Sequence, residues 1–252
     1  VKNLLIENNT VLKVSEHAIS FSGGTLSTNR IEDIVLRNNI CYKCHDIAVW
    51  RADNVTLDHN TIISNDDSYC HADSSYKVLD STDVVQINSL FAQAPTIRYQ
   101  SPLSELTQDH NYFFNMYDEL GDPCTATEQF ILCEGSGCPG DYLDLSSWQK
   151  DTGFDTHSAQ VTGDYDASAL DDLFVDPDPS DGTYDFTPKA DSWLCQDGNQ
   201  GSDGETIGAI TCFPEQQEDL EILSHSPDYT VHNSSVDSLV LSVLTNIASE
   251  CR

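Results

Sequence analysis

The residues best suited to chemistry are acids that recur at similar positions near the start of the chain. Glu16, Asp46 and Asp67 each follow a repeated asparagine by seven residues, and Asp66 precedes the last of them. If these positions stack, the carboxylates form a column. Such a column either binds Ca²⁺ through oxygen ligands or supplies the paired carboxylates of a glycoside hydrolase. In a chain this acidic it is also typical of a solvated turn surface.

Two lysines indicate a second kind of chemistry. Lys13 and Lys43 share an offset of four residues after the repeated asparagine. Stacked lysines could grip an anionic sugar, and together with Asp46 and Asp67 they are the catalytic candidates for cleavage of an acidic polysaccharide. Lysines surrounded by acids are also typical of simple surface charge pairing.

A third pattern is Cys41-Tyr42-Lys43-Cys44-His45, which matches the C-x-x-C-H sequence of covalent haem attachment. In that interpretation Cys41 and Cys44 bond the haem and His45 ligates the iron. The alternative is that the two cysteines are buried thiols or form a disulfide. The turn Asp155-Thr156-His157-Ser158 also combines an acid, a histidine and a serine, and we interpret it as structural because adjacency in sequence is not triad geometry.

The elements that must position these residues are repeats with an asparagine at a fixed place. The asparagines are 9, 39, 60, 88 and 111, spaced by 30, 21, 28 and 23 residues. Apolar residues occupy fixed offsets around them. Five positions before the asparagine stand Leu4, Ile34, Val55, Asp83 and Leu106, and two positions after it stand Val11, Cys41, Ile62, Leu90 and Phe113.

Alternation with period two before each asparagine predicts short strands, and the asparagine predicts a turn that tolerates unusual backbone angles. Repeated strand–turn–strand units of this length stack as a solenoid, so the sequence predicts an all-β fold, a parallel β-helix. The alternative is an antiparallel sandwich whose asparagine turns recur by coincidence.

These repeats resemble those of right-handed parallel β-helix proteins of the pectate-lyase-like superfamily, and the later chain resembles their irregular closing coils. The resemblance covers about 1–212, and includes the segments YLDLSSWQKDTGFDTHS at 142–158, LFVDP at 173–177, DFTP at 185–188 and TIGAI at 206–210. It implies the architecture, with a short helix at 142–150, and says little about the reaction. The chain departs from the family at 191–195, where DSWLC replaces the usual Ser-Pro-Ala turn.

The chain divides into three parts by composition. We expect a β-helix body at 1–212, an acidic linker at 213–234 and an apolar C-terminal tail at 235–252. The tail has a helical stripe of apolar residues, although its Val, Ser and Thr content also permits a strand. It either caps the body or docks on a neighbouring subunit. Because residue 1 already lies in a coil strand, we expect upstream sequence or another subunit to cover that edge.

The amino-acid composition limits which classes of binding partner and which cellular location fit this chain. The 42 acidic residues against 11 Lys plus Arg give a net charge of −31, which repels nucleic acid and anionic lipid heads. No apolar run is long enough to span a bilayer. The nine cysteines suit an oxidising exterior, and local disulfides are expected among Cys124, Cys133, Cys138, Cys195 and Cys212. Sequons at Asn8, Asn54 and Asn233 are also typical of a secreted glycoprotein.

The leading hypothesis is therefore a secreted β-helix structural or interaction module, a homo-oligomer or subunit of an extracellular assembly, rather than an enzyme. The alternative is the C-terminal portion of a polysaccharide lyase or glycoside hydrolase that acts on an extracellular polysaccharide. A haem-bearing extracellular protein is the third interpretation. Calcium is the cofactor most compatible with the acidic columns.

Overall fold

The structure is a computed structural model of the chain. It describes residues 2–23, 30–63, 76–93, 97–114, 130–134, 137–142, 144–161, 167–178, 182–212, 222–226 and 242–245. The chain forms two compact units, Val1–Cys212 and Phe213–Arg252.

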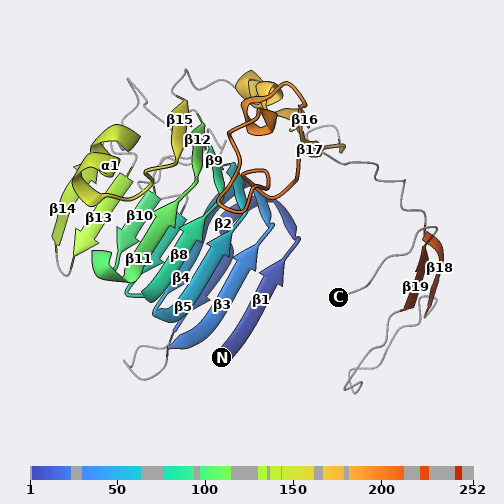
Figure 1. Cartoon of the computed structure of the whole chain (residues 1–252). Helices are drawn as coiled ribbons and strands as arrows, with labels where there is room; N and C mark the ends of the chain where they lie inside the picture. Colours follow the sequence, from blue (N-terminus) through green and yellow to red (C-terminus); the bar gives the residue numbers. More distant parts are fainter. Residues whose placement is uncertain are drawn as a thin grey trace, which may run out of the picture. The chain divides into compact units, whose positions relative to one another are not determined.

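The first unit is mostly β and contains two sheets with parallel pairing (Figure 1). The smaller sheet has five strands in the order β1-β3-β5-β8-β11, and every neighbouring pair is parallel. Its strands are β1 (Lys2–Glu7), β3 (Ile31–Arg37), β5 (Ala52–Asp58), β8 (Thr82–Ile87) and β11 (Leu106–Asp109). This parallel pairing shows that the antiparallel-sandwich alternative is wrong for these strands.

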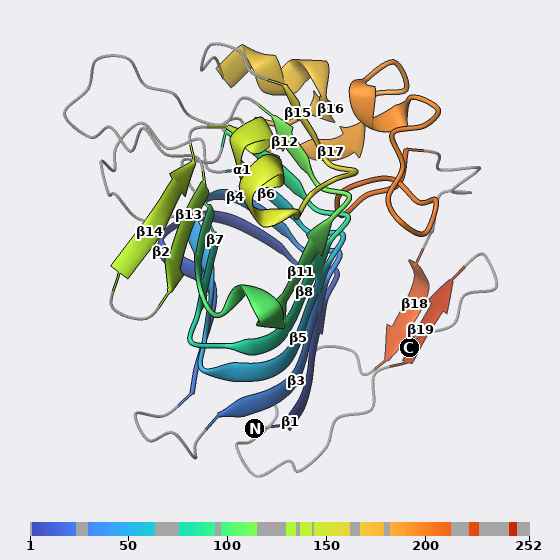
Figure 2. The same cartoon turned by 60° about the vertical axis from the view of Figure 1, so that its left-hand side comes forward.

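The larger sheet has ten strands in the order β14-β13-β10-β7-β4-β6-β9-β12-β15, with β2 also paired to β4. The strands are β2 (Thr10–Ser22), β4 (Ile40–Trp50), β6 (Thr61–Ile63), β7 (Tyr76–Leu79), β9 (Leu90–Ala92), β10 (Ile97–Gln100), β12 (Tyr112–Phe114), β13 (Phe130–Glu134), β14 (Gly137–Tyr142) and β15 (Ala159–Val161). Only the β13–β14 pair in it is antiparallel. From β1 to β12 the chain passes repeatedly from one sheet to the other, so that successive repeats lie in layers (Figure 2).

The remaining elements of this unit lie in the closing segment, apart from η1 (Leu103–Glu105), which lies between β10 and β11. They are the 3₁₀ turns η1, η2 (Ala167–Asp172) and η4 (Trp193–Cys195), the helix α1 (Leu145–Thr152) and the antiparallel pair β16 (Phe174–Asp176) and β17 (Asp185–Pro188). Helix α1 begins three residues later than predicted, because the side chain of Asp144 accepts a hydrogen bond from the backbone N–H of Ser147 and caps it there. It ends at Gly153, whose φ of 77° suits a glycine.

Apolar side chains at equal register positions build the core between the sheets. Leu4 pairs with Ile34, Ile34 with Val55, Val55 with Val84, and Val84 with Leu106. The fourth position is therefore Val84 and not Asp83, which corrects the predicted register of that repeat by one residue. A one-residue shift of a strand exchanges its two faces, and only the shifted register buries Val84.

The repeated asparagines form a ladder of side-chain hydrogen bonds at the corner between the sheets, which we call the corner ladder: Asn9, Asn39, Asn60, Ser89 and Asn111. The amide of Asn9 donates to Oδ1 of Asn39 over 3.0 Å, and the amide of Asn39 donates to Oδ1 of Asn60 over 3.1 Å. Ser89, rather than Asn88, continues the ladder: its Oγ accepts from the backbone N–H of Asn60.

The residue before each ladder position adopts a left-handed backbone. The φ angles of Asn8, Asn38, His59, Asn88 and His110 lie between 50° and 58°. Asparagine and histidine tolerate this conformation better than β-branched residues do. The recurrent Asn-Asn and His-Asn pairs of the sequence therefore divide two tasks, because the first residue turns the chain and the second bonds along the ladder.

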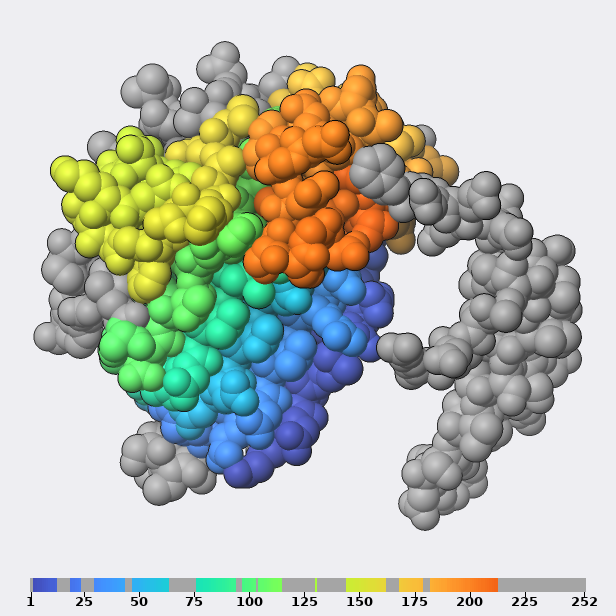
Figure 3. Space-filling view, in the orientation of Figure 1, coloured from blue at the N-terminus to red at the C-terminus, as the bar shows by residue number. Residues whose placement is uncertain are grey.

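Residues 182–212 of the closing segment lie against the first half of the chain (Figure 3). The backbone N–H of Gly208 donates to the carbonyl of Asn88, and that of Ala209 donates to Oγ1 of Thr61. Its apolar side chains, including Leu194 and Ile207, join a second core cluster with residues of the larger sheet. The closing segment thus covers the outer face of that sheet.

The second unit contains one described antiparallel pair, β18 (Ile222–Ser226) and β19 (Ser242–Thr245). Strand β18 lies within the stretch expected to be a linker. The helix predicted for the tail is wrong at 242–245, where Ser, Val, Leu and Thr form a strand, as their β-branched content permits. None of the helices in the described ranges is long and apolar enough to cross a membrane.

The corner ladder predicts a position-dependent loss of stability. Replacing Asn60 by Ala leaves the buried N–H and amide of Asn39 and the carbonyl of Leu36 without their partner. We expect a loss of about 2–4 kcal/mol in the free energy of unfolding. The measurement is urea unfolding followed by tryptophan fluorescence.

The matched control is Asn9→Ala at the exposed end of the same ladder, where water can replace the lost bonds. It should cost about 1 kcal/mol or less. Equal losses for the two variants would contradict the role given to the buried part of the ladder.

Candidate functional site

The side chains that converge with chemical potential lie just outside the corner ladder, where strands of the smaller sheet end. At two levels an Asp-His pair precedes the ladder residue: Asp58 and His59 before Asn60, and Asp109 and His110 before Asn111. The second pair meets His157 from the closing segment. We call Asp109, His110 and His157 the Asp–His–His cluster.

The Asp–His–His cluster is centred on the carboxylate of Asp109. The backbone N–H of His157 donates to Oδ1 over 2.7 Å, and Nδ1 of the same residue lies 2.6 Å from Oδ2. Nδ1 of His110 lies 3.4 Å from that same Oδ2. The two imidazole rings stack with centroids 4.8 Å apart and planes 19° apart. Two imidazoles thus face one carboxylate oxygen.

The turn that carries His157 is held by a buried aspartate, Asp155. Its carboxylate accepts hydrogen bonds from the indole N–H of Trp148 (3.0 Å), the amide of Asn111 (2.8 Å) and the hydroxyl of Ser158 (2.5 Å). Burial raises the pKa of Asp155 to about 6, although these donated bonds act in the opposite direction. Asp155 and Ser158 have the structural role that the sequence indicated, whereas His157 points to Asp109.

Electrostatics favours an ionised Asp109. Burial on its own would raise the pKa of this carboxyl, but the side-chain and backbone hydrogen bonds of His157 and the backbone N–H of His110 outweigh burial and lower it. The carboxylate is about one quarter exposed, and the His157 side chain is two-thirds exposed. The cluster is therefore open to solvent.

The other Asp-His pair is more enclosed. Nδ1 of His59 lies 2.7 Å from Asp58, and its Nε2 lies 3.6 Å from Asp203 of the closing segment. Burial lowers the pKa of His59, but the hydrogen bond with Asp58 and the charges of Asp58, Asp203 and Glu205 outweigh burial and raise it. Asp58 also accepts a bond from Asn88 over 2.9 Å. This pair therefore lies between the corner and the closing segment.

Most of the residues predicted from sequence to do chemistry have side chains outside the described part of the structure: Lys13, Glu16, Cys44, His45, Asp46, Asp66 and Asp67. The backbone register is described for Cys44 and Asp46. It pairs Cys44 with Val14, and Asp46 with His17 rather than with Glu16. The expected column is therefore offset by one residue between these strands. Lys43 lies over the ring of Tyr42, 5.7 Å from its centroid, as a cation–π contact.

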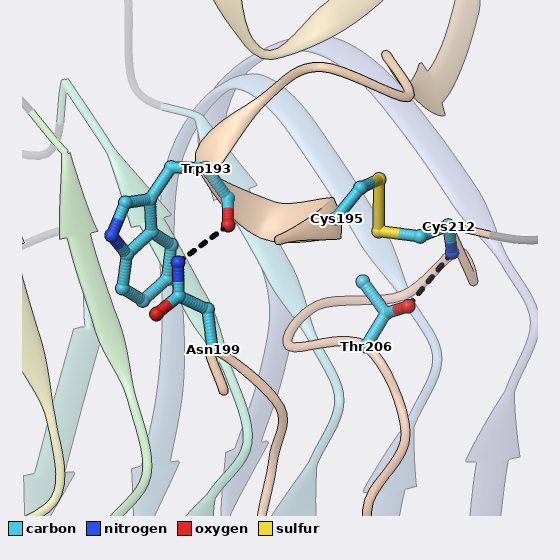
Figure 4. Close-up of a disulfide and its surroundings, with 5 residues drawn as sticks. All are labelled: Trp193, Cys195, Asn199, Thr206 and Cys212. Atoms are coloured by element: carbon cyan, nitrogen blue, oxygen red, sulfur yellow. Dashed lines mark hydrogen bonds between the residues drawn. A yellow bond between two sulfur atoms is a disulfide. The ribbon is translucent and has the colours of Figure 1, made fainter. Parts of the chain in front are cut away.

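The cysteines and sequons have varied surroundings. Cys41 is buried and disulfide-bonded, so its own thiol is not free to form a haem thioether. Cys195 and Cys212 form a disulfide that closes a loop also held by bonds from Asn199 to Trp193 and from Cys212 to Thr206 (Figure 4). Cys124, Cys133 and Cys138 have no described side chains. Of the sequon asparagines, Asn8 and Asn54 are exposed, and Asn233 lies outside the described residues.

Sequence reasoning missed the Asp–His–His cluster. A signal existed, because the triplet Asp-His-Asn occurs at 58–60 and again at 109–111, just before a ladder position each time. Its third member, His157, lies 48 residues after Asp109, and spacing alone does not bring them together.

Comparisons with known proteins add no relative. No family model, no curated protein and no solved structure matches this chain.

The enclosed pair predicts a pH-dependent contribution to stability. A histidine whose pKa is raised on folding stabilises the fold below its unfolded pKa of about 6.5, and this contribution is lost as the pH rises through the folded pKa. The stability difference between the native chain and His59→Gln should therefore be larger at about pH 5.5 than at about pH 8.5. Thermal unfolding of both proteins at each pH measures it.

Asp203→Asn serves as the control, because it removes one of the charges that raise the pKa of His59. In that background the pH dependence should shrink. A difference that grows with rising pH instead would have the wrong sign for this account.

The buried aspartate predicts a stability effect with little change in shape. Asp155→Asn retains a residue that tolerates the left-handed φ of 54° but places an amide donor among side chains that donate to this position. We expect a loss of about 2–3 kcal/mol. The exposed Asp151→Asn in the same helix region is the control and should be neutral. The measurement is urea unfolding of the two variants. Equal unfolding midpoints for Asp155→Asn and Asp151→Asn would contradict the stabilising role of the hydrogen bonds to Asp155.

Proposed function

We propose that this chain is an extracellular right-handed parallel β-helix module with a structural or interaction role, a subunit of an extracellular assembly. The support for a β-helix is the connectivity, since the chain passes from one parallel sheet to the other and back in each repeat. The pectate-lyase-like superfamily is the class that the repeats and the closing segment resemble. The disulfide Cys195–Cys212 favours an oxidising location.

The observation that carries the proposal is the surface at the β1 end of the sheets. In the described part of the chain, β1 pairs only with β3, so its other edge presents unpaired backbone groups. Ile6 is half-buried, although Leu36, its register partner one layer inward, is fully buried. An open hollow of about 520 Å³ lies at this end, and its lining includes Ile6, Val11 and Ile19.

A surface of this kind suits a further coil of the same geometry. Unpaired strand edges accept another strand by backbone hydrogen bonding, and apolar side chains beside the edge are buried in the process. A coil of upstream sequence, a second copy of the chain or another β-helix subunit offers that geometry, and the proposed assembly role takes the subunit. A single layer added in register would extend both sheets at once, which supports a role in ordered assembly rather than in loose contact.

The proposal predicts association through this end. The 252-residue chain should sediment as concentration-dependent oligomers in analytical ultracentrifugation. The variant Ile6→Lys should shift the distribution towards the monomer, because a lysine in the lining of the hollow would have to be desolvated beneath an added coil.

The control Val175→Lys changes an equally apolar residue that is 53% exposed in β16 and belongs to a different surface. It should leave the distribution unchanged. A native chain that stays monomeric at all concentrations, or an oligomer distribution that neither substitution changes, would refute the proposed assembly role.

A further inference from the structure

We propose that Asp109, His110 and His157 form a binding site for a divalent transition-metal ion of the zinc class. Within the described part of the chain, these residues are the group of three in which one donor atom from each side chain lies within 4.8 Å of the others. This inference is independent of the proposed assembly role.

The donor set fits such an ion. Nδ1 of His157 and Nδ1 of His110 lie 2.6 and 3.4 Å from Oδ2 of Asp109. Donors about 2.0–2.2 Å from a tetrahedral ion stand roughly 3.3–3.6 Å apart, so His110 already lies at a suitable distance from Oδ2, and the exposed His157 ring would move away from Oδ2 to admit an ion. Two imidazoles and a carboxylate are a usual set of three protein ligands for zinc, with the fourth position open to water.

The ligands are held by a supporting shell. Oδ1 of Asp109 accepts the backbone N–H of His157, which turns Oδ2 towards the two rings. The turn that carries His157 is held by the next residue, Ser158, whose Oγ accepts a hydrogen bond from the backbone N–H of Asn111 over 2.7 Å. Supporting hydrogen bonds of this kind orient the side chains that bind the metal directly, and they raise the affinity for the metal. The ladder residue Asn111 thus connects both sides of the site.

A purely structural role for the Asp–His–His cluster explains the contact of His157 with Asp109 but not that of His110. One histidine is enough to hydrogen-bond Asp109, and His157 already does so. The second ring, His110, stacks on the first and directs its Nδ1 to the same oxygen. The net charge of −31 attracts cations generally, while imidazole nitrogens select transition ions over Ca²⁺ and Mg²⁺.

The test uses the full 252-residue chain after chelator dialysis, with excess Mg²⁺ present to occupy acidic surface sites. Co²⁺ is titrated while its visible absorption bands are recorded, and Zn²⁺ then competes for the site. We expect Zn²⁺ to displace Co²⁺, and each of His110→Gln and His157→Gln to weaken Zn²⁺ binding about tenfold or more.

The matched control is His59→Gln, which alters the other Asp-His pair of the corner and should leave the affinity unchanged. Circular dichroism of the metal-free variants checks that each is folded. Absence of Co²⁺ bands, an affinity unaffected by His110→Gln and His157→Gln, or an equal loss in His59→Gln would overturn the proposal. His110→Gln keeps the test valid if His157→Gln fails to fold, because His110 makes the weaker contact with Asp109.

Discussion

The corner ladder is the interaction on which the rest of this structure depends. Its side chains are buried from Asn39 to Asn111, and each one bonds backbone or side-chain groups of the next layer. A buried polar group without a partner costs more than its hydrogen bond contributes, so the ladder strongly disfavours any layer that is out of step. Because it lies where one sheet ends and the other begins, it fixes the register of both.

The ladder also determines what happens at its far end. Asn111 has no further repeat asparagine to bond, and its amide donates to Asp155 of the closing segment. Asp155 in turn binds Trp148 of α1, whose ring stacks with the core residue Phe130. One continuous series of polar contacts thus positions the helix and the turn relative to the repeats. The same connection brings His157 to Asp109, so the candidate metal site is a consequence of how the ladder ends.

Much of the body could be predicted from sequence, because burial repeats at fixed offsets from a chemically distinctive residue. The failure at the fourth repeat is instructive. Its identity aligns Asn88 with the other repeated asparagines, yet the adjacent Ser89 occupies the ladder. Only the cross-strand pairing of Val84 with Val55 and Leu106 decides between the two residues. Side-chain type alone cannot settle a one-residue choice when both neighbours are polar and able to bond.

The candidate site was harder to predict for a different reason. Its members come from two segments 48 residues apart, and their meeting depends on how the closing segment docks. Local spacing showed the acids at 16, 46 and 67 instead, because residues at equal offsets are easy to see in a repeat. The second unit shows the same limit: a stripe of apolar residues fitted both helix and strand, and pairing with β18 made 242–245 a strand.

The most direct measurement for the central claim is the exchange rate of side-chain amide protons by NMR spectroscopy. The corner ladder predicts slow exchange with solvent for the carboxamides of Asn39, Asn60 and Asn111, which are buried and hydrogen-bonded, beside fast exchange for the exposed Asn54. Fast exchange at all four asparagines would contradict the ladder, and with it the register of both sheets.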